Sequence, residues 1–263
     1  MAAGELKKEW AVVTGASSGI GLAFARELAR RGHPVLAVAR RRERLDALAR
    51  EAAEHGGRVE PLAADLKTDD GLASVARRIT ELGSIALLVN NAGVATGGDF
   101  KSAPLQDELG AIRLNVVAVV TLTHHVLNEM TRRGSGAVIN VASVVAFQPF
   151  PHFAIYAATK AFVLSLTEAL AEEVKGTGVR IVALCPGAAR TEIDVFAHNK
   201  GLLGRLPSLT PEEIVEAALR ALNDGSVVEV VGWMNWMLTF MNRFMPRRAV
   251  RWLMGVSVQP PAG

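Results

Sequence analysis

The sequence predicts an α/β fold in which a doubly wound, seven-stranded parallel sheet carries helices on both faces. Two observations support this prediction. Short runs rich in Val, Ile, Leu and Ala alternate along the chain with longer segments whose apolar residues recur at helical spacing. The short runs are apolar almost throughout, which is typical of parallel strands buried on both faces. Because crossovers between parallel strands are right-handed, successive helices can cover both sides of such a sheet.

The first half of the chain contains four expected strands and three expected helices. The helical patterns end near residues 31, 55 and 82, and glycines directly follow the first two. For the third helix, we expect Asp69 or Asp70 to be the N-cap. The four strands are the apolar runs 10–14, 34–39, 59–66 and 86–93.

The second half continues the same alternation. A long helix is expected through Asn115 to about residue 133, and the next spans 153–175. Thr210 and Glu213 enclose Pro211 in a capping box, which opens a helix that ends near residue 223. The remaining strands are expected at 137–143, 180–187 and 227–231.

The length and composition of the chain favour a single domain that spans residues 1–263. Half of the 263 residues are hydrophobic, and no repeat or linker divides the chain. The net charge of +3 and the absence of a long basic tract argue against nucleic acid as a partner. A single cysteine precludes an internal disulfide and favours a cytoplasmic location. The N-terminus lacks the apolar core of a signal peptide, and no uninterrupted apolar run reaches the roughly 18 residues of a spanning helix, so neither is expected.

A glycine-rich turn follows the first strand. The segment VVTGASSGIG (12–21) places Gly15, Gly19 and Gly21 between a strand and a helix. Glycine at these positions permits a tight turn and a close approach of the backbone to a pyrophosphate, which the free N–H groups at the helix start can bind. A glycine pattern alone is weak evidence, but here the required strand and helix flank it. We therefore expect a dinucleotide site at this turn.

The residues after the second strand indicate which dinucleotide is preferred. Sites for NAD usually place an acidic residue here, but the chain has Arg40 and Arg41, and no acid before Glu43. A guanidinium offers paired donors to phosphate oxygens. We expect a preference for NADP(H), with Arg40 as the main contact to the 2′-phosphate and Arg41 as the second. NAD(H) remains an alternative cofactor.

Taken in order, several motifs resemble the short-chain dehydrogenase/reductase family over about residues 8–231. They are TGASSGIG, NNAG (90–93), Asn115, Ser143, YAATK (156–160) and PG (186–187) with Thr191. The resemblance implies a Rossmann fold, interconversion of carbonyl and alcohol groups, and a catalytic set of Asn115, Ser143, Tyr156 and Lys160. It also implies that the cofactor is bound by Gly15, Ser17, Ser18, Gly19, Ile20, Gly21, Arg40, Arg41, Asp65, Leu66, Asn91, Ala92, Gly93, Tyr156, Lys160, Pro186, Gly187 and Thr191.

The residues of YAATK suit acid–base chemistry. Reduction of a ketone creates an alkoxide that needs a proton, and Tyr156 is the only tyrosine. A free phenol has a pKa near ~10. Lys160 lies one helical turn later on the same face, and its cation favours the phenolate. Ser143, at the end of a strand, can donate a hydrogen bond to the substrate oxygen. In the family, the residue corresponding to Asn115 holds a water that links the lysine to solvent.

The substrate side is apolar. The segment between Ser143 and Tyr156 is expected to contribute a hydrophobic wall, and residues 189–206 a lid, so we expect a hydrophobic ketone, aldehyde or alcohol as substrate. No metal site is expected, because the adjacent residues His124 and His125 point to different faces of a helix. The expected substrate contacts are Ser143, Val145, Phe147, Phe150, Phe153, Tyr156, Ile193 and Phe196.

The C-terminal extension, 232–263, departs from the family, many of whose members end in a short strand that joins a tetramer. Residues 232–255 form an amphipathic, partly basic segment that Pro246 should interrupt. Three alternatives stay open: this segment packs on its own domain or pocket, binds a second subunit, or lies on a membrane surface. A homodimer through the helices at 105–133 and 153–175, or a homotetramer, is expected.

The primary hypothesis is an NADPH-dependent carbonyl reductase that is reversible as an alcohol dehydrogenase. A non-catalytic NADP(H)-binding sensor or scaffold on the same fold is the main alternative. An epimerase or dehydratase is less favoured, because the region after the last strand is short for a sugar-binding domain.

Overall fold

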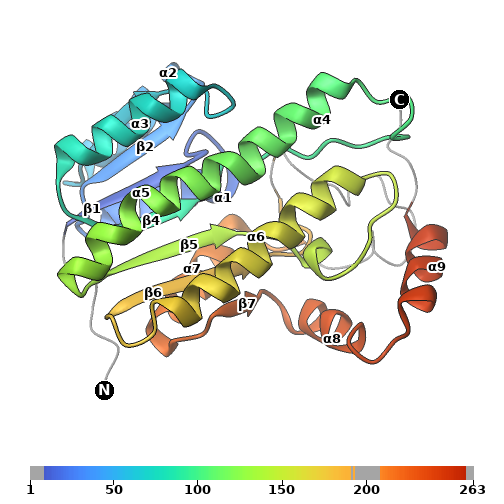
Figure 1. Ribbon diagram of the computed structural model, residues 1–263. Coiled ribbons are helices and arrows are strands. Elements are labelled where there is room, and N and C mark those ends of the chain that lie inside the picture. The colour runs from blue at the N-terminus through green and yellow to red at the C-terminus, as the bar shows by residue number, and fades with distance from the viewer. Residues whose placement is uncertain (1–8, 191, 193–207, 259–263) are drawn as a thin grey trace.

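All seven strands of the central sheet are parallel, in the order β3-β2-β1-β4-β5-β6-β7. The protein is represented by a computed structural model that describes residues 9–190, 192 and 208–258. The order reverses between β1 and β4, which is the doubly wound arrangement expected from the sequence (Figure 1). The strands are β1 (Trp10–Thr14), β2 (Val35–Ala39), β3 (Val59–Ala63), β4 (Ile85–Asn90), β5 (Gly136–Val141), β6 (Val179–Cys185) and β7 (Val228–Val230).

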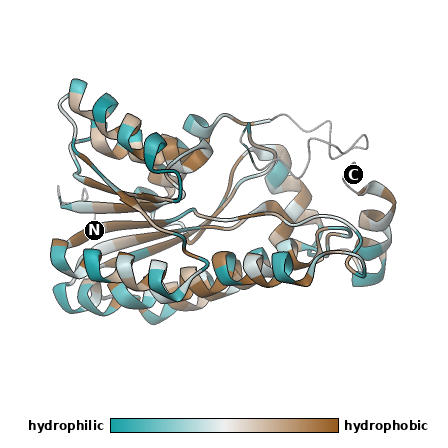
Figure 2. Ribbon diagram, turned by 90° about the horizontal axis from the view of Figure 1, so that it is seen from above, coloured by the Kyte–Doolittle hydropathy of each residue, from teal (hydrophilic) through white to brown (hydrophobic). Residues whose placement is uncertain are grey.

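Helices cover both faces of the sheet, as Figure 2 shows. One face carries α1 (Gly19–Arg30), α2 (Arg42–Glu54) and α7 (Pro211–Asp224). The other carries α3 (Asp69–Leu82), α5 (Ala118–Arg133) and α6 (Ala154–Glu173). Successive side chains of a strand point to opposite faces of the sheet, so both faces must be covered. In β1, Val13 belongs to the core of the first face and Val12 to the core of the second, and both are fully buried. The chain therefore needs apolar residues at consecutive strand positions.

The cap of α3 differs from the sequence prediction. Thr68, and not Asp69 or Asp70, is the N-cap, and its Oγ1 accepts a hydrogen bond from the backbone N–H of Gly71 at 3.0 Å. The two aspartates lie in the first helical turn, where their charges favour the helix dipole. The expected capping box of α7 is confirmed, with Thr210 and Glu213 bonding each other's backbone N–H groups.

The long helix through Asn115 is interrupted. It consists of α4 (Leu105–Ile112), a π-helical turn (η1, Arg113–Val117) and α5. The wider turn places Asn115 in the interior, with 1% of its surface exposed. Such bulges recur at functional sites. The stretches Leu105–Arg133 and Ala154–Glu173 are long and apolar enough to cross a membrane by length and composition alone, but core helices pass the same test and both contribute buried side chains to the core.

The C-terminal extension forms two helices, α8 (Trp233–Met241) and α9 (Arg247–Ser257). The predicted interruption is confirmed, because Pro246 is the N-cap of α9. The buried face of α9 packs on the chain's own core through Val250 and Met254, in one cluster with Phe153 and Tyr156. In Figure 1, both helices lie at the end of the molecule reached by the carboxyl ends of the strands.

A buried polar network holds α5 and α6 against the sheet. Asn90 Nδ2, at the end of β4, donates to Asn140 Oδ1 on β5 at 2.8 Å and to Thr123 Oγ1 on α5 at 2.9 Å. Asn140 Nδ2 donates to Thr167 Oγ1 on α6 at 3.0 Å. All four side chains are buried. The network thereby fixes the position of the helix that carries Tyr156 and Lys160.

We predict that Asn140→Ala lowers the free energy of unfolding by about 2–4 kcal/mol, because it removes one hydrogen-bond partner each from the buried side chains of Asn90 and Thr167 and opens a cavity. Denaturant unfolding measures this loss. The matched control is Asn128→Ala on the exposed side of α5, which should change the free energy by less than about 0.5 kcal/mol. Equal effects of the two substitutions would contradict a structural role of the network.

Candidate active site

A cleft of about 430 Å³ lies across the carboxyl ends of the strands on either side of the β1–β4 reversal. Ligands of open α/β sheets bind at such a switch point. The expected residues that line the cleft are Gly15, Ser17, Ser18, Gly19, Ile20, Arg40, Arg41, Asp65, Leu66, Asn91, Ala92, Gly93, Ser143, Tyr156, Lys160, Pro186 and Gly187. The expected contacts Thr191, Ile193 and Phe196 lie outside the described residues, as does most of the proposed lid.

The glycine turn is packed closely against the loop after β4. Gly15 has a φ of 68°, which L side chains rarely adopt. A Cβ atom at Gly15 would approach Asn91 Nδ2 to 2.7 Å, and one at Gly21 would collide with the same nitrogen. Asn91 Nδ2 donates to the carbonyl of Thr14 at 2.9 Å, so the two loops form one rigid floor. Gly21 supports this floor from behind and does not itself line the cleft.

The start of α1 faces this floor. The helix begins at Gly19, and Ser18 before it is extended, so the first N–H groups of the helix lack intrahelical acceptors. Their partial positive charge suits a pyrophosphate. The cleft therefore fits a dinucleotide at this end, because the helix N–H groups face it and the lining residues Gly15 and Gly19 carry no side chain that would fill the space.

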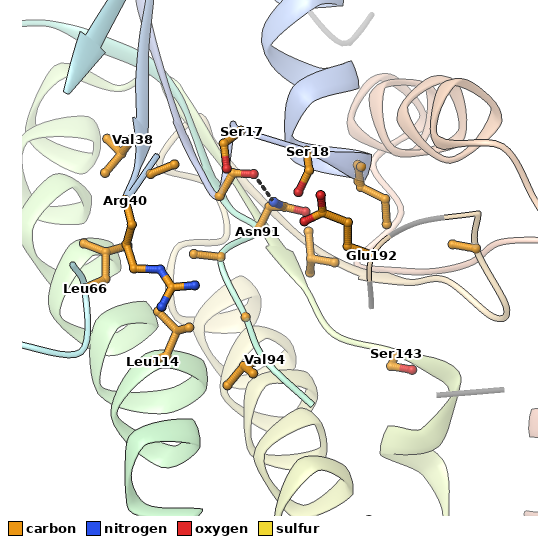
Figure 3. A pocket seen from close by; sticks show the side chains of 18 of the residues that line it. Ser17, Ser18, Val38, Arg40, Leu66, Asn91, Val94, Leu114, Ser143 and Glu192 are labelled. Carbon is orange, nitrogen blue, oxygen red and sulfur yellow. Dashed lines mark hydrogen bonds between the residues drawn. The ribbon is translucent and has the colours of Figure 1, made fainter. Parts of the chain in front are cut away.

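Arg40 and Arg41 differ in their contacts. Arg41 Nη2 donates to Ser17 Oγ at 3.0 Å and to Ser18 Oγ at 2.9 Å, and it forms an ion pair with Glu192 at 2.9 Å. Arg40 has no hydrogen bond or ion pair with the residues that the structure describes, and its guanidinium extends along the cleft past Leu66 toward Leu114 (Figure 3). Arg40 is therefore the guanidinium that a phosphate can bind without displacing a partner.

Glu192 is a lining residue that was not predicted from the sequence to contact the cofactor. Its carboxylate also pairs with Arg44 at 2.7 Å, and the hydrogen bonds from Arg41 and then Arg44 lower its pKa to about 2. About 150 residues separate this carboxylate from the two arginines. Nothing in the local sequence indicates the contact, since it depends on β2 and β6 ending at the same edge of the sheet.

Ser143, Tyr156 and Lys160 meet at the other end of the cleft, away from Arg40; Figure 3 shows Ser143 there. Ser143 follows β5 and is hydrogen-bonded to Tyr156. Lys160 Nζ donates to the carbonyl of Val141 at 2.7 Å and lies 5.8 Å from the centre of the Tyr156 ring. The exposed fractions are 4% for Ser143, 7% for Tyr156 and 5% for Lys160. Three polar side chains with little contact to bulk water thus converge on one point.

Burial dominates the protonation of this group. It raises the pKa of Tyr156 to about 12, against a smaller lowering by the hydrogen bond with Ser143. It lowers the pKa of Lys160 to about 8. From the sequence, we expected the neighbouring cation to lower the pKa of Tyr156, but desolvation of the phenolate is the largest effect and raises it.

Asn115 lies beneath the cleft wall and not in it. Its Oδ1 accepts from the backbone N–H of Val94, and its Nδ2 donates to the carbonyl of Val94 and to Thr159 Oγ1. A Cβ atom at Gly93 would lie 3.3 Å from Asn115 Oδ1 and 3.6 Å from Lys160 Nζ. The backbone of Gly93 therefore borders a space that both groups reach.

The expected hydrophobic wall is packed into the core. Val145, Phe150 and Phe153 are buried in the cluster that includes Tyr156 and α9, and none of them lines the cleft. Phe147 is partly buried and packs on a neighbouring cluster beside Cys185. Of the expected substrate contacts, the described cleft is lined by Ser143 and Tyr156. The aromatic residues instead support the loop that carries Ser143.

The curated relatives include a short chain dehydrogenase and a hydroxysteroid dehydrogenase. A short chain dehydrogenase of Pseudocercospora fijiensis is 40% identical over 72% of this chain, and the match spans 62% of that protein's length. The 17-beta-hydroxysteroid dehydrogenase type 3 of Homo sapiens is 36% identical over 82% of this chain and 69% of its own length.

Two solved structures match nearly the full chain. A short-chain dehydrogenase from Sphingobium yanoikuyae, in complex with NADPH, is 36% identical with a TM-score of 0.79, and the match covers 97% of this chain and 98% of that one. A bulky-bulky ketone specific alcohol dehydrogenase from Comamonas testosteroni is 32% identical with a TM-score of 0.77, covering 97% and 96%.

We predict that the stability of the protein responds to the buried ammonium of Lys160. Its pKa is about 8 in the fold and ordinarily 10.5, so between these pH values the unfolded chain binds more protons. Stability relative to Lys160→Met should therefore rise with pH across this window, by about 1.4 kcal/mol per pH unit. Urea unfolding of both proteins from pH 8 to 10.5 measures the difference, and a difference that is flat or falls would contradict the assignment.

The fold, the cleft and the sequence together identify the family to which this chain belongs. A profile described as short chain dehydrogenase matches residues 9–200, which is most of the chain. The strand order, the glycine turn and the group around Tyr156 agree with the motifs quoted from the sequence. The chain belongs to the short-chain dehydrogenase/reductase family and is an oxidoreductase.

Proposed function

We propose that the protein is an NADPH-dependent carbonyl reductase, reversible as an alcohol dehydrogenase, that acts on hydrophobic ketones, aldehydes or secondary alcohols. The observation that carries the proposal is the convergence of Ser143, Tyr156 and Lys160 at one end of a cleft whose other end carries the glycine turn and Arg40. A non-catalytic sensor would not need these three buried polar groups beside its nucleotide. The relatives named for hydroxysteroids and bulky ketones support the substrate class.

The proposed roles follow from protonation and geometry. A bound nicotinamide supplies or accepts the hydride. Tyr156 Oη gives its proton to the carbonyl oxygen during reduction, and its raised pKa keeps this donor protonated at neutral pH. Ser143 Oγ donates to the same oxygen and stabilises its developing negative charge. Lys160, a cation at pH 7 despite its lowered pKa, stabilises the phenolate that Tyr156 becomes after the proton has left.

The proposed role of Asn115 is to hold a water between itself and Lys160. Both N–H groups of its amide already donate to Val94 and Thr159, so Oδ1 is the atom that offers a further lone pair. Asn115 Oδ1 and Lys160 Nζ also lie on the same side of Gly93, because both are close to the position that a Cβ atom of this residue would occupy. A water there would return protons from solvent to Tyr156 by way of Lys160.

We predict that Tyr156→Phe lowers reductase turnover by at least about 100-fold, because the variant lacks the proton donor. The change is measured as NADPH oxidation with a panel of aryl, aliphatic and steroid ketones. Circular dichroism and the dissociation constant for NADPH serve as controls and should stay within about threefold of the parent. A folded Tyr156→Phe protein with full turnover would overturn the proposed role.

The preference for NADPH is proposed from Arg40. Its exposed guanidinium is free of partners in the described part of the chain, whereas Arg41 is held by Ser17, Ser18 and Glu192. A 2′-phosphate at Arg40 would gain charge-assisted hydrogen bonds. NADH, which lacks that phosphate, would use the same cleft without this contact.

We predict that Arg40→Asp lowers kcat/KM for NADPH by about 10–100-fold, the value of a hydrogen bond to a charged group, and leaves or raises kcat/KM for NADH. Arg41→Ala should have a smaller effect, since Arg41 is already engaged. Arg77→Asp, an equal charge change on the exposed side of α3, is the control. An NADPH/NADH ratio that Arg40→Asp leaves unchanged would refute the role of Arg40.

We also propose self-association, as a dimer or tetramer, through the outer faces of α4, η1, α5 and α6. These faces expose apolar side chains that a monomer would leave in water. Their exposed fractions range from 39% to 64%. The side chains are Leu105, Leu109, Val117, Val120 and Phe162.

A further inference from the structure

We propose that the outer surface of α8 and α9 docks on a membrane that contains anionic lipid. This C-terminal surface is defined by its exposed apolar and basic side chains. The inference goes beyond the proposed reaction, because docking requires neither cofactor nor turnover. The surface consists of Trp233, Trp236, Met237, Phe240, Met241, Phe244, Trp252, Leu253 and Val256, with Arg243, Arg247, Arg248 and Arg251.

Helix α8 buries polar side chains and exposes apolar ones, which is the reverse of the usual pattern in a surface helix. Its buried residues are the polar Asn235 and Thr239. Asn235 Nδ2 donates to the carbonyl of Val231 at 2.7 Å, and its amide packs so closely on Gly187 that a Cβ atom there would overlap it. Trp233 and Trp236 point outward, with 72% and 55% of their surfaces exposed. A surface helix ordinarily buries its apolar stripe, so this orientation leaves the stripe available to an apolar partner.

The outward aromatic residues form one continuous ridge. The rings of Trp236 and Phe240 are stacked with centroids 5.1 Å apart, and Phe240 meets Phe244 edge-on at 5.2 Å. Phe244, in the turn after α8, is 75% exposed. Tryptophan is favoured where apolar and aqueous phases meet, because its ring is apolar and its N–H is polar. The ridge therefore suits a lipid–water boundary.

Helix α9 extends the surface and anchors it. Val250 and Met254 are buried in the cluster around Tyr156, while Trp252 points outward with 70% of its surface exposed. Figure 1 shows α8 and α9 at one end of the molecule, beyond the sheet, and Figure 2 shows α9 at the same end from above. Both helices can thus reach a flat surface at that end.

Charge selects the membrane over a second copy of the chain. Residues 230–263 contain four arginines and no Asp, Glu or Lys. Among the residues that the structure describes, none of these arginines forms an ion pair. Two copies facing each other here would bring like charges together, with no acidic residue in the segment to pair with them. Anionic headgroups would satisfy the arginines while the acyl region accepts the aromatic residues.

The position of α9 has a consequence for the substrate, which rests on the proposed function. The same helix contacts the lipid surface outside and the Tyr156 cluster inside. An apolar carbonyl compound dissolved in the membrane would then lie one helix away from the reacting groups. The substrate class favoured by this arrangement is one that partitions into lipid.

The test is co-sedimentation of the full-length protein, without cofactor or substrate, with vesicles of phosphatidylcholine alone or mixed with phosphatidylserine. We expect binding to the mixed vesicles that weakens as salt rises. Arg247→Glu, Arg248→Glu and Arg251→Glu together should lower the partition coefficient by more than about tenfold. Trp233→Ser, Phe244→Ser and Trp252→Ser together should do the same, by removing buried apolar area.

The controls make equal changes elsewhere on the molecule. The charge control combines three substitutions on α2, α3 and α7, namely Arg50→Glu, Arg77→Glu and Arg220→Glu. The aromatic control is Phe100→Ser, which removes a side chain that is 62% exposed. Both control proteins should bind vesicles as the parent does. Absence of binding to mixed vesicles would overturn the proposal, as would C-terminal variants that bind like the parent. An oligomer in light scattering that the C-terminal variants dissolve would assign the surface to a second copy. NADPH-dependent turnover, assayed separately, reports on the proposed function alone.

Discussion

The buried ammonium of Lys160 is the constraint on which the arrangement of the site depends. A cation with little exposure to water is costly unless it is hydrogen-bonded, and the carbonyl of Val141 at the end of β5 provides the bond. This bond requires α6 to cross the end of β5 at that level. Tyr156 lies one turn earlier on the same helix and is consequently placed beside Ser143, which follows β5. One polar contact thus sets the relative positions of all three groups.

The polar core beneath the site serves the same end. Side-chain hydrogen bonds of Asn90, Asn140 and Thr167 connect β4, β5 and α6. Burying any of these polar groups without its partner would be unfavourable. Apolar packing alone tolerates small shifts of a helix along a sheet, whereas directional bonds do not. The network therefore gives α6 the precision that proton transfer over hydrogen-bond distances needs.

The two ends of the cleft differ in their electrostatics: one presents positive charge to an anion, and the other buries titratable side chains away from water. At the glycine turn, backbone N–H groups and Arg40 offer positive charge to an anion, and Glu192 compensates Arg41. At the Tyr156 end, burial raises the pKa of Tyr156 and lowers the pKa of Lys160. At neutral pH, Tyr156 is therefore a neutral phenol and Lys160 is still a cation. Helix α9 packs against the residues at this second end through Val250 and Met254, which share an apolar cluster with Tyr156. Helix α8 separates environments in a similar way at the surface of the molecule, because its buried residues are the polar Asn235 and Thr239 and its tryptophans are exposed.

The sequence by itself determined the strand–helix alternation, the glycine turn and the residue types of the cleft, because these depend on local periodicity and on motifs a few residues long. It did not identify Thr68 as the cap of α3, since neighbouring Asp and Thr side chains compete for the same N–H group. The π turn at Asn115 and the contact of Glu192 with Arg41 and Arg44 were decided by tertiary structure. So was the burial of Phe150 and Phe153, because hydrophobicity marks a residue as apolar without saying whether it faces a cleft or a core. The outward orientation of Trp233 and Trp236 was settled in the same way, by the close fit of Asn235 against Gly187.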